Sequence, residues 1–284
     1  MAASEQLDVL VKQLPAADVG RTYCTNIDKD KIETTIAAIH RGGTASVLGL
    51  IDMLAEPKLG QEVMDVKPHY ALHCLANYVL QRKDEKGRRE FCETLAAQIG
   101  GERPKGVQAY LCQELQWAGR SEAVPALGKV LNDNELSAPA AMALVAIGDG
   151  ASQQFRAALP SAAGRCKLNV VQGLGAMGDK ESIPALQALL ADEDREIRLA
   201  AGWGLARMGD AGSVAVLTKA AGVPDGWERI QAAKHCLVLA EKLLAAGQKS
   251  AAVTLGQYLR DSRSSAHEKY VRDAAEKVLA AAQP

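Results

Sequence analysis

The apolar residues of this chain recur with helical spacing, and the pattern is clearest between residues 180 and 210. In one segment they are three or four positions apart and therefore share one helix face: Ile197, Ala201, Leu205 and Met208. Gly209 follows, at a place where glycine often ends a helix. The apolar segment 184–190 begins with Pro184, and proline is favoured in the first turn of a helix. The unit is therefore predicted to be a pair of helices.

Two short phrases repeat together along the chain. The phrase LQWAG at 115–119 returns in related form at 144–148, 174–178 and 205–209, so the copies start 29, 30 and 31 residues apart. The phrase EAVPAL at 122–127 returns at 181–186 and, more loosely, at 213–217. Such a period is typical of stacked helix pairs, because one pair cannot bury both of its apolar sides alone. We place pairs at 44–80, 82–120, 121–149, 150–179, 180–210, 211–247 and 248–282.

The repeat predicts an all-α fold, a right-handed α-solenoid of about seven helical hairpins. Residues 1–43 contain helical stretches near 4–14 and 28–40 without the repeat, and are predicted to form an N-terminal cap. Residues 44–284 are predicted to form one continuous solenoid domain. The first two pairs are longer than the others, which we attribute to loops at 56–67 and 81–88.

Composition and charge narrow the classes of partner. The chain has 33 Lys and Arg against 34 Asp and Glu, so no overall positive field attracts phosphate backbones, and no nucleic-acid partner is expected. No stretch approaches the roughly 18 apolar residues of a membrane span, which predicts a soluble chain. The first residues show no signal peptide, which favours the cytoplasm. The Ala-Ala-Ser sequence at 2–4 is also what leader cleavage can leave, so an extracytoplasmic location stays open.

The repeated phrases resemble the HEAT repeat, in the short bacterial form also seen in phycobilisome-lyase-like proteins. The resemblance covers roughly residues 44–284 and implies that Asp194 and Arg198 tie adjacent units together. It also implies that the second helices line a concave face. The function expected from it is a non-catalytic scaffold that binds a protein partner on that face. Two alternatives stay open: an accessory bilin-lyase-like enzyme, and a structural module of a larger secreted bacterial enzyme.

Alignment of the second helices on their shared leucine selects one row of residues on that face. The predicted partner-binding residues are His69, His73, Asn77, Gln113, Trp117, Gln172, Trp203 and Arg207. Tryptophan and arginine dominate the energetics of many interfaces. Either tryptophan could instead fill a gap between adjacent helix pairs, and the sequence leaves both interpretations open.

Metal binding and catalysis are not predicted. His69 and His73 are four residues apart and share a helix face, as a metal pair requires, but Asn77 continues that face and is a poor ligand for transition metals. An ordinary solvated or partner-facing histidine pair is favoured, and no metal or other cofactor is expected. The glycine-rich phrase at 173–178 closes a helix instead of joining a strand to a helix, so it does not indicate a dinucleotide site.

The six cysteines are scattered without any CxxC pair. All except Cys24 fall within apolar helical patterns, which favours small buried side chains over reactive thiols. Disulfide formation in an oxidising compartment stays open. No nucleophile with an evident base stands out, so the chain is predicted not to be an enzyme.

Overall fold

All regular secondary structure in the described residues is helical. The computed structural model describes residues 2–15, 27–56, 66–224 and 226–283. These contain sixteen α-helices, four short 3₁₀ helices and no strand. The chain divides into two compact units, Met1–Gln154 and Phe155–Pro284, referred to below as the N-terminal and C-terminal units.

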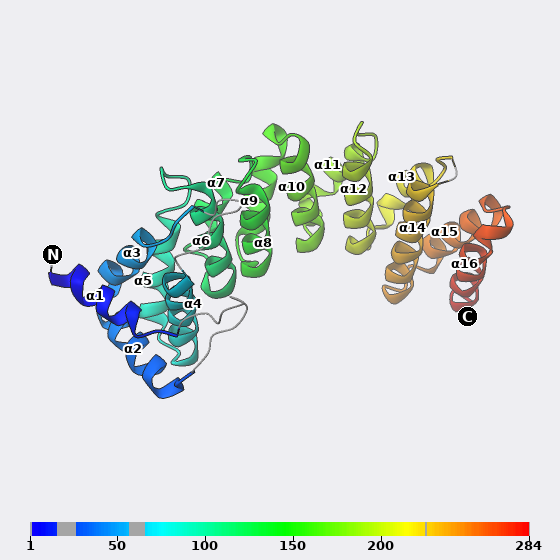
Figure 1. Ribbon diagram of the computed structural model, residues 1–284. Coiled ribbons are helices and arrows are strands. Elements are labelled where there is room, and N and C mark those ends of the chain that lie inside the picture. Colours follow the sequence, from blue (N-terminus) through cyan, green and yellow to red (C-terminus); the bar gives the residue numbers. More distant parts are fainter. Residues whose placement is uncertain (1, 16–26, 57–65, 225, 284) are drawn as a thin grey trace. The chain divides into compact units, whose positions relative to one another are not determined.

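In the N-terminal unit, several helices pack against the helix that follows two places later in the sequence. Its helices are α1 (Ala2–Lys12), α2 (Lys29–Arg41), α3 (Gly43–Asp52), α4 (Val66–Gln81), α5 (Glu85–Ala96), α6 (Lys105–Ala118), α7 (Val124–Lys129) and α8 (Ser137–Ile147). The second helices of successive pairs pack in the order α4, α6, α8, while α3 packs on α5 (Figure 1). Helix α9 (Ala151–Ala158) begins at the end of this unit.

The C-terminal unit repeats the same arrangement. It contains η1 (Leu159–Ser161), α10 (Gly164–Met177), η2 (Lys180–Ser182), α11 (Ile183–Leu189), α12 (Arg195–Met208), η3 (Ala211–Ser213), α13 (Val214–Ala220), α14 (Trp227–Ala245), α15 (Lys249–Ser262), η4 (Ala266–Glu268) and α16 (Lys269–Ala281). Helix α12 packs between α10 and α14, and α14 also contacts α16. Figure 1 shows α10, α12 and α14 side by side.

The predicted all-α solenoid is confirmed, since each unit stacks one helix pair on the next. Each predicted pair holds two α-helices, from α3 with α4 to α15 with α16. Helices α1 and α2 form where the predicted cap has its helical stretches. The boundary of that cap at residue 43, and the continuity of 44–284 as one domain, stay predictions.

The predicted loop at 81–88 is wrong. Helix α4 ends at Gln81 and α5 begins at Glu85, because the Asp84 side chain accepts a 2.9 Å hydrogen bond from the Gly87 amide and caps the new helix. Polar residues that suggested a loop thus start a helix, and Arg88 is buried within it. The extra length of this pair lies at 97–104 instead. Most of the predicted loop at 56–67 lies outside the described residues.

Close helix contacts in the C-terminal unit depend on glycine. A Cβ atom on Gly175 would lie 2.9 Å from the Cα atom of Gly204, so α10 and α12 meet backbone to backbone there. The glycine-rich phrase at 173–178 therefore serves helix packing. Its last residue, Gly178, takes a left-handed conformation with φ of 63° and ends α10, as predicted.

Ion pairs link neighbouring second helices. Arg198 on α12 bonds both carboxylate oxygens of Glu228 on α14, at 2.6 and 2.7 Å. This agrees with the tie between units that the HEAT resemblance implies for Arg198. Asp194 has a different role, since it accepts a 2.8 Å hydrogen bond from the Glu196 amide and caps its own helix. Lys105 and Asp133 form a related pair at 2.6 Å in the N-terminal unit.

Five cysteines lie within the described residues. Four are buried and Cys74 is half-buried: the buried ones are Cys92, Cys112, Cys166 and Cys236. Burial raises the pKa of Cys92, Cys112 and Cys236 to about 12, which keeps each sulfur protonated and unreactive at neutral pH. Cys24 lies outside the described residues.

Candidate functional site

The predicted partner-binding residues are divided between the two units. In the N-terminal unit they are His69, His73 and Asn77 on α4 and Gln113 and Trp117 on α6; in the C-terminal unit they are Gln172 on α10 and Trp203 and Arg207 on α12. Gln113 and Gln172 are exposed to solvent. The two groups have different surroundings.

Trp117 is exposed and also held in one orientation. Its side chain is 58% exposed, and its indole Nε1–H donates a 3.1 Å hydrogen bond to Oδ1 of Asn77 on the neighbouring helix. The Asn77 amide group donates in turn to the carbonyl oxygen of His73 at 2.9 Å. The bond to Asn77 is made at the N–H edge of the indole ring, so it restrains the ring while more than half of the residue stays exposed.

A buried carboxylate pairs with His73, whose ring is the neighbour of Trp117. The His73 ring, whose centroid is 5.9 Å from that of Trp117, places Nδ1 at 3.2 and 3.3 Å from the two oxygens of Glu114 on α6. The Glu114 side chain is only 5% exposed, whereas that of His73 is half exposed. Burial raises the pKa of Glu114, and the nearby His73 opposes this shift most strongly.

His69 and Tyr110 complete this group. The Tyr110 hydroxyl donates a 2.7 Å hydrogen bond to the His69 carbonyl oxygen, and the two rings meet edge to face at 4.3 Å. His69 and His73 therefore contact different side chains on α6. In the part of the chain that the structure describes, no three His, Cys, Asp or Glu side chains are placed to hold a metal ion.

We name this group the Trp117 cluster: His69, His73, Asn77, Tyr110, Glu114 and Trp117. Glu114 and Tyr110 were not among the predicted residues. Glu114 stands directly before the shared leucine of its repeat, where the later copies have Ala143, Gly173 and Gly204. All four positions are buried. A charged residue in a row otherwise filled by alanine and glycine was the signal that could have identified it.

Helix α8 packs beside α6 and presents an apolar surface to solvent. Its sequence has no charged residue, and Met142 and Val145 are exposed. A helix that is apolar on its solvent side is typical of a surface used for binding. Neither residue was selected from the sequence, because both lie in a helix that is apolar on every side.

Trp203 has the opposite environment. It is half-buried, and its ring lies against Gly175, where a Cβ atom would be 2.8 Å from the ring. The Arg207 guanidinium lies 4.9 Å from the ring centroid. Of the two interpretations that the sequence left open, packing therefore fits Trp203 and an exposed anchor fits Trp117.

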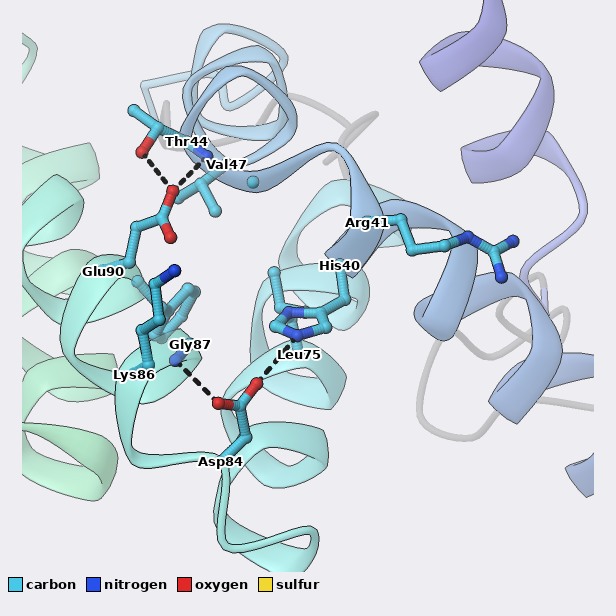
Figure 2. Close-up of a pocket in the computed structure, with 11 residues that line it drawn as sticks. His40, Arg41, Thr44, Val47, Leu75, Asp84, Lys86, Gly87 and Glu90 are labelled. Atoms are coloured by element: carbon cyan, nitrogen blue, oxygen red, sulfur yellow. Dashed lines mark hydrogen bonds and ion pairs between the residues drawn. The ribbon is translucent and has the colours of Figure 1, made fainter.

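A hollow of the N-terminal unit lies between α2, α3 and α5, with a volume of about 330 Å³ (Figure 2). Nε2 of His40 lies 3.0 Å from the Asp84 carboxylate, and the Thr44 hydroxyl donates to Glu90 at 3.0 Å. Both pairs join α5 to the helices before it. Since these polar groups bond mainly to one another, we assign them to structure and regard the Trp117 cluster as the stronger candidate site.

The HEAT resemblance is confirmed for part of the chain. Residues 152–238 match the family model of HEAT repeats. No curated protein matches the sequence.

Two solved structures are similar to the chain at low identity. A designed armadillo repeat protein in complex with the peptide (KR)4 is 19% identical, with 96% of this chain and 99% of that chain covered and a TM-score of 0.31. The complex of CpcE and CpcF of phycocyanin lyase from Nostoc sp. PCC7120 is 18% identical, with coverage of 96% and 94% and a TM-score of 0.30. These scores are too low to support an argument about function. Within the described ranges, no helix combines the length and apolar character needed to cross a bilayer.

Proposed function

We propose that this chain is a non-catalytic scaffold that binds a protein partner through the solvent-facing side of its second helices. The observation that carries the proposal is Trp117, a large aromatic side chain that is 58% exposed and yet held by a hydrogen bond to Asn77. Exposing so large an apolar side chain has little benefit for folding, since its burial would stabilise the protein. A use in binding accounts for its exposure.

The fixed orientation of Trp117 favours tight binding. Tryptophan is one of the residue types that contribute most at interfaces. A side chain that is already held in place loses less conformational entropy when a partner arrives. Asn77 and His73 form the support for the ring, and α8 offers further apolar area through Met142 and Val145.

The proposal keeps the predicted residues of each unit as a separate binding surface. They are His69, His73, Asn77, Gln113 and Trp117 in the N-terminal unit and Gln172, Trp203 and Arg207 in the C-terminal unit. We assign the larger contribution to the N-terminal set, because Trp203 already contacts Gly175 and Arg207. No observation among the described residues favours the bilin-lyase-like enzyme or the secreted-enzyme module, so neither is proposed.

The proposal can be tested by selecting peptides from a random library displayed on phage. Wild-type protein is the target, and each selected peptide is then measured by calorimetry against Trp117→Ala and Trp227→Ala. Trp227 is the matched control, because it is also 58% exposed but belongs to the C-terminal unit, at the start of α14. We expect Trp117→Ala to weaken binding at least about tenfold and Trp227→Ala to leave it unchanged.

Circular dichroism establishes that both variants keep their helical content. Equal losses in the two variants, or no loss in either, would remove Trp117 as the anchor and with it the proposed face.

A further inference from the structure

We infer that the partner presents a cationic side chain, arginine or lysine, to the Trp117 cluster. This inference rests on the proposed function and specifies the chemistry of the group that is bound. The guest cation lies over the exposed part of the Trp117 ring, next to the His73–Glu114 pair. Three observations support it. The cluster contains a buried negative charge and several aromatic rings, and the basic side chains near it bond to groups outside the cluster.

The negative charge belongs to Glu114. Its carboxylate is 5% exposed and lies against Nδ1 of His73. The groups that act most strongly on it are His73, Tyr110 and His69, and none of these carries a permanent positive charge. A buried carboxylate is stabilised by a cation within a few ångströms. His73 is half exposed, so its ring has room to turn aside when a guest approaches.

The aromatic rings suit a cation better than an anion. The faces of indole, phenol and imidazole rings carry excess electron density, and a cation within about 6 Å of a tryptophan ring is attracted to it. The edge of the Trp117 ring is occupied by its bond to Asn77, so a guest meets the face. An acidic guest would meet that same face and the Glu114 charge, and both would repel it.

The chain's own nearby cations are used elsewhere. Of the basic side chains on or beside α4 and α6, three have an acidic partner outside the cluster: Arg82 with Glu33 at 2.6 Å, Lys105 with Asp133 at 2.6 Å, and Arg120 with Glu85 at 2.8 Å. Lys67, on α4, donates to the carbonyl oxygen of Lys12 at 2.7 Å. Helix α8 has no charged residue at all. The charge of Glu114 is therefore available to a cation supplied by a partner.

The test compares two pentapeptides that differ in charge alone. Acetyl-Gly-Gly-Arg-Gly-Gly-amide carries the guanidinium, and the same peptide with citrulline replaces it with a neutral group of the same shape. Each is titrated into the full chain while the indole N–H signals are followed by NMR, with Trp→Phe variants assigning the signals. The arginine peptide is expected to shift the Trp117 signal and to bind about tenfold tighter than the citrulline peptide. The Trp227 signal should not move.

Glu114→Gln provides the second arm, because it keeps the shape of the side chain and removes the charge. In this variant the preference for arginine should disappear. The inference is overturned if the two peptides act equally on wild-type Trp117, if neither shifts it at millimolar concentration, or if Glu114→Gln keeps the full preference. The wild-type comparison does not use Glu114→Gln, so a folding defect in that variant does not obscure it.

The library selection separates this inference from the proposed function. Peptides that depend on Trp117 but contain no arginine or lysine would overturn the cationic guest and leave the binding face intact. Peptides that bind independently of Trp117 would overturn the face itself.

Discussion

The two units place a tryptophan on their second helices in opposite ways. In the N-terminal unit Trp117 is exposed beside His73, which pairs with a buried carboxylate, whereas in the C-terminal unit Trp203 lies against Gly175 and beneath the guanidinium of Arg207. Both belong to the same predicted face. Their positions in the repeat differ, since Trp117 stands two residues after the shared leucine and Trp203 two residues before it. At each position the neighbouring helix decides how much of the tryptophan is covered.

The cause lies in the row before the shared leucine. Gly204 occupies that row in α12 and lets α10 approach until backbone meets backbone, and the Trp203 ring then covers the seam beside it. Glu114 occupies the same row in α6, and there the contact with α4 passes through His73. In the C-terminal unit this row serves close helix packing, whereas in the N-terminal unit it holds a buried carboxylate that pairs with His73.

The largest expected effect comes from adding volume to the glycine seam. Gly175→Val should destabilise the C-terminal unit by about 3 kcal/mol or more, because its Cβ would lie 2.9 Å from the Cα atom of Gly204 and the helices must separate. Ala188→Val, on the exposed side of α11, is the control and should cost less than about 1 kcal/mol. Urea denaturation followed by circular dichroism measures both. Equal costs would mean that glycine does not set the distance between α10 and α12.

A buried histidine gives the C-terminal unit its own pH dependence. His235 on α14 is 7% exposed and lies close to Gly202, and burial lowers its pKa from 6.5 to about 4. Between pH 6.5 and about 4, His235 is protonated in the unfolded chain but not in the folded chain. The stability of this unit should therefore fall as the pH drops from 6.5 to 4, by up to about 3 kcal/mol.

Hydrogen exchange of the α14 amides, corrected for the pH dependence of intrinsic exchange, measures this loss. His235→Gln should remove most of the dependence, while His267→Gln, at an exposed position of η4, should keep it. A His235→Gln variant with the wild-type pH profile would exclude His235 as the cause.

Substitution of each tryptophan tests the comparison directly. Trp203→Ala should cost about 2 kcal/mol of stability, since it leaves a cavity over the glycine seam. Trp117→Ala should cost less than about 1 kcal/mol, because most of the side chain already contacts water. Thermal and urea unfolding of the two variants give the order, and the reverse order would mean that Trp117 is the packing residue.

Much of the architecture could be predicted from the sequence because the repeat carries redundant information. The recurring leucine, the proline at the first helix and the glycine at the end of the second each mark the same boundaries, and the helices from α7 to α16 form within the predicted pairs. The prediction was wrong at 81–88, where the run of polar residues was the single feature that indicated a loop. There the polar run around Asp84 resembled a loop, and its role as a helix cap depends on a single side-chain bond to Gly87.

The candidate site was less predictable, since exposure depends on contacts between helices. The sequence selected His73, Asn77 and Trp117 by their spacing, and the structure brings these three together. It could not separate Trp117 from Trp203, because the two glycines that seat Trp203 lie on different helices. Glu114 was missed because alignment on the exposed row passes over the buried row beside it.

The smallest expected effect concerns the pH dependence of the N-terminal unit, and its sign is the opposite of that for His235. Burial raises the pKa of Glu114 above its ordinary value of 4.5. Between 4.5 and the raised value the folded chain holds a proton that the unfolded chain has released, so stability is greater below this window and is lost as the pH rises through it. Hydrogen exchange of the α6 amides should therefore slow as the pH falls toward 4.5, after correction for intrinsic rates, and Glu114→Gln should remove the effect.

In the same sample the α14 amides should exchange faster as the pH falls, because His235 takes up a proton when its unit unfolds. If both helices instead respond in the same direction, the two buried groups do not control their units, and the contrast between a charged row and a glycine row has no energetic consequence at this pH.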